Sequence, residues 1–266
     1  MKKLFCALIM MVMLAGVASG EVVGVLAKMN ASPGDYQKFL ADRHSKKIRT
    51  VLRSQGDISC SFYESLTAML MALNSGRIDS MFLPECTADY ILREHSGIES
   101  RGYFSERNLM GLTMGFREEN AELRDKVNSA LADMSKDGTS SLLIKRYISA
   151  HNTKPVKFEH FNDADTLKIA ITGDLPSIDY VDVGGNASGF NTALLAKLGR
   201  RLHMNIQLVQ VEAGARAAAL TSGRVDCVFW FAVYPGGGNQ WDIPKGVIVT
   251  SPYFSWDKNL LLGLKK

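Results

Sequence analysis

The sequence has few of the residues that build metal sites or disulfide frameworks. It contains four cysteines and five histidines in 266 residues, and none of them has the spacing of a metal-ligand motif. Each histidine therefore fits a surface or capping role better than a ligand role, and we expect neither a metal nor another cofactor. If Cys6 is removed with the N-terminus, Cys60, Cys86 and Cys227 leave at least one thiol unpaired.

A strong excess of one charge is also missing. The chain carries 31 basic and 27 acidic side chains, a formal net charge of +4. Without Lys2 and Lys3 the basic count falls from 31 to 29 against 27 acids, a net charge of about +2. Nucleic-acid binding needs a clustered basic surface, so we expect no nucleic-acid partner.

No apolar run of membrane-spanning length follows residue 20, and the run before it is short. Lys2 and Lys3 precede the apolar stretch 4–17, and the small residues Ala18-Ser19-Gly20 follow it. A membrane anchor is the alternative, but roughly 14 apolar residues are too few to span a bilayer. The pattern predicts a signal peptide at 1–20, cleaved after Gly20, and a soluble, monomeric secreted chain that begins at Glu21.

What the chain does contain is an internal repeat. Residues 72–79 (ALNSGRID) recur as residues 219–226 (ALTSGRVD). A helical pattern precedes each copy, and an apolar run follows each, at 81–83 and 227–230. Each copy therefore predicts a helix that ends at a glycine and leads into a buried strand.

Matching segments flank both copies. The pattern of strand and helix, written twice, predicts two parallel α/β lobes. Two more helices and a polar linker containing Pro155 are expected between them. The expected strands are 22–26, 58–62, 81–83, 167–171, 205–211 and 227–230; the expected helices are 35–40, 66–73, 119–134, 139–148, 191–202 and 213–220; the linker covers 151–165.

These residues resemble the family-3 extracellular solute-binding proteins, the periplasmic receptors of ABC transporters. The second half looks like the family's beginning, with Thr172-Gly173-Asp174-Leu175-Pro176, Gly189-Phe190-Asn191 and the repeat at 222–226. The first half looks like its ending, with the repeat at 75–79 and Asp137-Gly138-Thr139 before the last helix. The family order is swapped, which indicates a circular permutation.

The resemblance implies a periplasmic-binding-protein type II fold of class α/β, in which each lobe is a mostly parallel sheet flanked by helices. One lobe would hold residues 21–115 plus 257–266, and the other residues 116–256. Two hinge strands, near 111–116 and 253–261, would join the lobes, and the linker 151–165 would join the family's usual termini. Localisation would be periplasmic.

Ligands bind outside the carboxyl ends of strands in such sheets, so two facing lobes place these ends in one cleft. Trp230 and Phe231 have the alternative of being core aromatics, since one of two adjacent strand residues points inward. The candidate ligand-binding residues are Thr172, Gly173, Asp174, Trp230, Phe231, Ala232 and Tyr234 in one lobe and Met29, Asn30, Ser61, Phe62 and Glu85 in the other.

Arg216 has two interpretations. Its guanidinium would suit a ligand carboxylate bidentately, or it is an ordinary solvated side chain among small residues.

The family's usual carboxylate-binding Arg is absent from 234–239, and Pro84 stands at or beside the position of the family's ammonium-binding Asp. Met29-Asn30 also replaces the usual Gly-Thr/Ser-Thr. Glu85 with Arg216 could rebuild such a site, or the ligand belongs to another class.

Three functions compete at this point. The first is capture of an amino acid or related small polar compound, by lobe closure, for delivery to an ABC permease in the inner membrane. The second is an enzyme of the cyclohexadienyl dehydratase type, with Glu85 or Asp174 as general acid, and the third is a sensor that presents its ligand. No pair of carboxylates or His-centred group stands out, so we expect no enzyme.

Overall fold

The structure is a computed structural model that describes residues 20–26, 58–233 and 243–265. Its main sheet has nine strands in the order β2-β1-β3-β12-β4-β10-β5-β9, with β11 paired to β4, and a small sheet has the order β6-β7-β8. The strands are β1 (Glu21–Leu26), β2 (Ile58–Tyr63), β3 (Ser80–Pro84), β4 (Ile98–Arg117), β5 (Thr166–Ile171), β6 (Asp174–Leu175), β7 (Asp179–Val181), β8 (Ala187–Ser188), β9 (Asn205–Gln210), β10 (Cys227–Val233), β11 (Val247–Val249) and β12 (Phe254–Leu264).

What we call the first unit is built on strands β2, β1, β3 and β12 and the first part of β4. Strands β2, β1 and β3 are parallel to one another, and β12 and β4 continue the sheet in antiparallel pairing. Two helices, α3 (Leu66–Asn74) and α4 (Glu85–Glu94), pack on these strands. Met69, Leu73, Met81 and Ile91 are buried between helices and strands, so the apolar pattern of the sequence forms this core.

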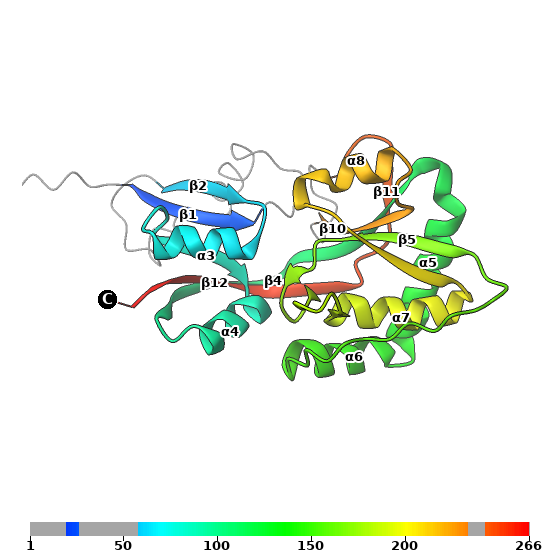
Figure 1. Ribbon diagram of the computed structural model, residues 1–266, viewed down its shortest axis with the longest axis horizontal. Helices are drawn as coiled ribbons and strands as arrows, with labels where there is room; N and C mark the ends of the chain where they lie inside the picture. Colours follow the sequence, from blue (N-terminus) through cyan, green and yellow to red (C-terminus); the bar gives the residue numbers. More distant parts are fainter. Residues whose placement is uncertain (1–19, 27–57, 234–242, 266) are drawn as a thin grey trace, which may run out of the picture.

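The rest of the sheet forms the second unit. Strands β9, β5 and β10 are parallel, and β4 and β11 follow in antiparallel pairing. Figure 1 shows α8 on one side of these strands and α7 with α5 on the other. The helical elements are η1 (Glu118–Asn120), α5 (Ala121–Lys136), α6 (Thr139–Leu143), the π-helical turn η2 (Ile144–Ser149), α7 (Phe190–Leu202), η3 (Ala213–Ala215) and α8 (Arg216–Thr221).

The two units have the same strand order, because corresponding strands of the internal repeat occupy equivalent positions in the sheet. In the first unit this order is β2-β1-β3-β12-β4, and in the second it is β9-β5-β10-β4-β11. The predicted α/β fold class is confirmed, but the mostly parallel sheets expected of the two lobes are joined by antiparallel β4 and β12 into one mixed sheet.

Two long strands join the units. The first part of β4 pairs with β12 in the first unit, and its last part pairs with β10 and β11 in the second. Strand β12 is irregular near the crossing, with a register shift between Trp256 and Lys258. Figure 1 shows both strands running through the middle of the molecule. They occupy the places predicted for hinge strands.

The described ends of the chain leave the first unit at one edge. Val23 of β1 lies beside Ser80 of β3, and Leu262 of β12 lies beside Met81 of the same strand. The start of β1 and the end of β12 are therefore two strand spacings apart, about 10 Å. They lie on the side of the first unit that faces away from the second (Figure 1).

Several elements differ from the sequence prediction. Helix α4 begins at Glu85 directly after β3, where only a strand end was expected, and β4 extends back to Ile98. The helix expected at 139–148 ends at Leu143 and continues as a π-helical turn. The helix expected at 35–40 and the signal peptide at 1–20 lie outside the described residues, apart from Gly20. The segment 151–161 has neither helix nor strand, as expected of a linker.

Across the described ranges, no helix is long and apolar enough to cross a membrane.

Cys60, Cys86 and Cys227 are all free thiols, and Cys86 and Cys227 are buried. Burial raises the pKa of the Cys86 thiol to about 12. Cys86 and Cys227 are therefore apolar core residues rather than reactive groups at neutral pH.

Candidate functional site

The carboxyl ends of the strands in the two units face each other. Asp174 follows β5 of the second unit, and its Oδ2 accepts the backbone N–H of Leu66 of the first unit at 3.1 Å. Glu64 follows β2 of the first unit, and its Oε2 accepts the N–H of Gly214 of the second unit at 2.9 Å. The meeting place of these strand ends, where the sequence predicts the ligand site, is called the cleft below.

A buried hydrogen-bond network fixes the turn that carries Asp174. The backbone N–H of Thr172 donates to Asp179 Oδ2 at 3.2 Å, and Gln210 Nε2 donates to the Thr172 carbonyl at 3.1 Å. Gly173 has φ +72°, and a Cβ there would lie 2.7 Å from Val181 Cγ2. Only glycine adopts this close, left-handed turn without strain, so Gly173 directs Asp174 toward the first unit.

Glu85 lies on the other wall, at the first residue of α4. Its Oε1 pairs with Lys258 Nζ of β12 at 2.6 Å, and the same ammonium lies 4.9 Å from the ring centroid of Tyr103. One turn further on, burial and the Glu85 carboxylate raise the pKa of Asp89, against the opposing effect of His151, Lys258 and other cations. Glu85 therefore already has a cation within its own unit.

His151 of the linker contacts a neighbouring turn of its own, second unit. His151 Nδ1 lies 3.2 Å from Ser177 Oγ. Burial and the Arg93 guanidinium lower the pKa of His151, and Asp89 opposes that shift. The charges of Asp89 and Arg93 on α4 therefore act on His151 across the units.

Arg216 is 1% exposed and lies inside the second unit. Its Nε donates to the Ala213 carbonyl at 2.9 Å, and its Nη1 donates to the Phe229 carbonyl at 3.1 Å. The interpretation as a solvated side chain is wrong, because the preceding turn and β10 cover the guanidinium although its neighbours along α8 are small. Its role toward a ligand carboxylate stays a prediction.

The remaining predicted residues fall into two groups. Ser61 and Phe62 are half-buried within β2, paired with Gly24 and Val25, rather than beyond the strand end. The backbone of Trp230, Phe231 and Ala232 belongs to β10, with a register shift between Phe229 and Phe231. Predicted site residues outside the described ranges are Met29, Asn30 and Tyr234.

Sequence reasoning missed Glu64 and Lys258 near the cleft and the contact of His151 in the linker. Lys258 and His151 stand in a strand and a linker that carry no motif. Only Glu64 had a usable signal, since it lies between a predicted strand and the N-cap Ser65 of a predicted helix. In the described part of the chain, no three His, Cys, Asp or Glu side chains gather as metal ligands.

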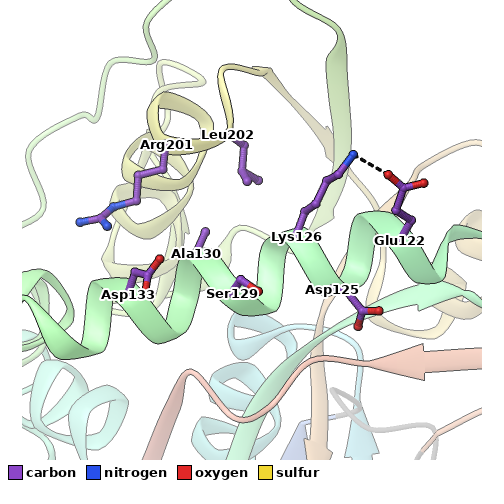
Figure 2. Close-up of a pocket in the computed structure, with 8 residues that line it drawn as sticks. All are labelled: Glu122, Asp125, Lys126, Ser129, Ala130, Asp133, Arg201 and Leu202. Atoms are coloured by element: carbon purple, nitrogen blue, oxygen red, sulfur yellow. Dashed lines mark ion pairs between the residues drawn. The ribbon is translucent and has the colours of Figure 1, made fainter.

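Two surface hollows lie among the helices of the second unit, away from the contacts of Asp174 and Glu64. Figure 2 shows one of about 570 Å³ between α5 and α7, where Lys126 pairs with Glu122. Arg201 at its rim pairs with Asp137. The other, of about 410 Å³, runs between α5, α6 and residues 251–255. Neither lies at the carboxyl ends of parallel strands, where ligands of such sheets bind.

The fold and the cleft define a two-unit α/β protein in which strand ends face each other. Residues 167–234 match the sequence model of the bacterial extracellular solute-binding proteins, family 3. This match confirms, for the second unit, the family resemblance indicated by the motifs.

A curated relative from Escherichia coli K12, the putative ABC transporter arginine-binding protein 2, is 28% identical over 115 residues. That alignment covers 42% of this chain and 43% of the relative, so less than half of each is compared.

Two solved structures are similar at low identity. The aliphatic sulphonate binding protein SsuA from Escherichia coli is 14% identical, with 92% of this chain and 65% of that chain covered and a TM-score of 0.43. The GluR0 ligand-binding core in complex with L-glutamate is 12% identical, with 94% and 87% covered and a TM-score of 0.44. The chain thus spans slightly less than two thirds of the SsuA chain.

Proposed function

We propose that this protein captures a small molecule between its two units and delivers it to an ABC-type permease from the periplasm. The observation that carries the proposal is the facing of two sets of strand ends, from which Asp174 and Glu64 reach across the cleft. Two long strands are the kind of connection about which such units close. The family match and the curated relative are both binding proteins, which supports binding without chemistry.

We also propose that the two units are the lobes 21–115 plus 257–266 and 116–256, in circularly permuted order. The start of β1 and the end of β12 lie at one edge of the first unit, so the usual chain could run directly from one to the other. The segment 151–165 would then replace the usual termini. Its contacts, such as Val156 N–H to the Ala187 carbonyl at 2.9 Å, hold it on the second unit.

The ligand we propose is an amino acid or a related small compound with a cationic group. The carboxylates of Glu64 and Asp174 cross between the units, and Glu85 and Asp89 of α4 have Lys258 and Arg93 as nearby cations. An excess of negative charge favours a positively charged ligand through electrostatic complementarity. The relative named as an arginine-binding protein supports the same class.

A thermal-shift screen over amino acids, small carboxylates and polyamines tests this function. A bound ligand at a hundred times its dissociation constant stabilises the folded protein by about 2.7 kcal/mol. We expect a shift with basic amino acids, and none with the carboxylates at equal ionic strength. A shift with anionic compounds alone would contradict the proposed ligand class, and no shift with any compound would contradict capture of these classes.

A further inference from the structure

We propose that Glu64 and Asp174 form a crosswise latch that holds the two units together without a solute. Each carboxylate comes from one unit and accepts a backbone N–H at the start of a helical segment in the other, Gly214 and Leu66 respectively. The inference rests on the proposed function, because a latch has a role only if the units open and close.

The start of α3 receives its negative charge from the second unit. Ser65 caps the helix through its Oγ, which accepts the Ala68 N–H at 3.1 Å, and the first turn of α3 contains no acidic residue. Asp174 accepts the next free amide, that of Leu66. A carboxylate at a helix N-terminus is stabilised both by the hydrogen bond and by the helix dipole.

The start of η3, which leads into α8, receives its negative charge from the first unit. The N-cap residue Glu212 makes no side-chain capping bond, and the first turn holds no acidic residue. Glu64 accepts the Gly214 N–H instead. A Cβ at position 214 would lie 3.3 Å from Glu64 Oε1, closer than most Cβ contacts, so glycine leaves room for this approach.

The two helical starts are equivalent in the internal repeat, which explains why they meet. Residues 66–73 and 213–220 precede the two copies of the repeat, and Ser65 and Glu212 are the corresponding N-caps. Because one carboxylate crosses in each direction, opening the units breaks both contacts in a single motion. The two contacts should therefore behave as one cooperative unit.

Hydrogen exchange of the two held amides measures this cooperativity. The exchange rate of a protected amide follows the population of the open form. In the solute-free protein, we expect Glu64→Ala to accelerate exchange of the Leu66 N–H, and Asp174→Ala to accelerate exchange of the Gly214 N–H. Each effect should be roughly tenfold, since a hydrogen bond to a charged group contributes about that factor. Glu212→Ala, on the same turn as Gly214, is the matched control and should change neither amide.

Each variant is measured at the amide that the other carboxylate holds, so that a purely local role gives a different result. If each carboxylate protects only the amide that it touches, Glu64→Ala leaves Leu66 unchanged and Asp174→Ala leaves Gly214 unchanged, which overturns the latch. The Ile169 amide, in the buried strand β5, reports global unfolding and should keep its rate. Gly214→Ala retains both carboxylates, and by displacing Glu64 it should also accelerate exchange of Leu66.

Failure of the latch and failure of the proposed function can be told apart. If solutes stabilise the protein but the crossed amides keep their rates, the latch is wrong and capture stands. If the crossed amides respond but no solute of the screen produces a thermal shift, the contact between units is real and the proposed capture is wrong.

Discussion

Arg216 has a structural role that neither interpretation from the sequence, a ligand contact or a solvated side chain, included. Its guanidinium is buried and donates to two backbone carbonyls, of Ala213 and Phe229. These bonds tie the start of α8 to β10 within the second unit. The side chain therefore stabilises the wall of the cleft whether or not it also contacts a ligand.

We predict that Arg216→Met lowers the free energy of unfolding by about 2–4 kcal/mol, because buried carbonyls lose charged donors. Urea denaturation without solute measures this loss. Arg224→Met, at an exposed position in the repeat, is the matched control and should be nearly neutral. Unchanged stability combined with lost solute binding would instead make Arg216 a ligand-binding residue.

The exposed pair of Asp137 and Arg201 predicts a pH dependence. The Arg201 guanidinium, with Thr139, lowers the pKa of Asp137 to about 2. Because the folded-state pKa lies below the ordinary value of 3.8, the pair stabilises the protein above about pH 4, and this contribution is lost as the pH falls toward 2. Asp137→Asn should therefore be less stable than the natural chain at pH 6 and equal to it near pH 2.

Urea titrations at several pH values, at constant ionic strength, measure the effect of Asp137→Asn. Glu99→Gln changes another exposed carboxylate that has no ion pair among the described contacts, and its difference from the natural chain should not vary in the same way. A constant difference between Asp137→Asn and the natural chain from pH 6 to pH 2 would contradict the lowered pKa.

At the residue scale, the sequence predicted cleft residues that follow from strand ends and missed those that depend on tertiary contacts. Asp174 comes directly after a recognisable strand, and it reaches the cleft. Lys258 meets Glu85 only because β12 lies beside β3, a pairing of segments 173 residues apart. No local pattern encodes such a contact.

At the scale of elements, close packing between α7 and β9 gives a further prediction. A Cβ at Gly199 would lie 2.7 Å from Ile206 Cγ1 and 2.9 Å from the Met204 carbonyl oxygen. Gly199→Ala should lower the free energy of unfolding by about 1–3 kcal/mol through overpacking, although alanine is the better helix former. Thermal or urea denaturation provides the measurement.

Gly97→Ala is the control for Gly199→Ala, since nothing lies within 4 Å of a Cβ built at Gly97. It should leave stability nearly unchanged. Equal stability of the two variants would show that α7 can move away from β9 without cost, contrary to the close packing described.

Elements with a clear hydrophobic period were predicted within a few residues, and those without one were missed. Helix α7 and strand β5 start one residue before their predicted bounds. Helix α4 was missed because it begins immediately after Pro84, with no turn residues to separate it from β3. The first part of β4 carries many polar residues, so only its partner β12 defines it as a strand.

For the whole molecule, the permutation proposal predicts that the chain can be re-ordered. Joining Lys265 to Glu21 through about six Gly and Ser residues spans the 10 Å between the strand ends. New ends between Lys154 and Pro155, which are both exposed, leave the contacts of residues 156–165 intact. We expect cooperative unfolding, with a free energy within about 1 kcal/mol of the natural order.

Urea denaturation and the same solute screen measure the outcome for the re-ordered chain. A second re-ordered chain, opened between Ala170 and Ile171 within the buried strand β5, should fail to fold. If the chain opened at Lys154 also fails to fold, residues 151–165 are an integral part of the second unit rather than a link between former termini.

The common edge at which β1 begins and β12 ends also determines how the protein resists force. Pulling on Glu21 and Leu264 in opposite directions acts across the sheet rather than along its strands. The backbone hydrogen bonds of β3 to β1 and β12 would then break one after another, as in unzipping, instead of all at once in shear. Stretched through these ends, the first unit should peel apart at low force while the second, reached only through β4 and β12, is still folded.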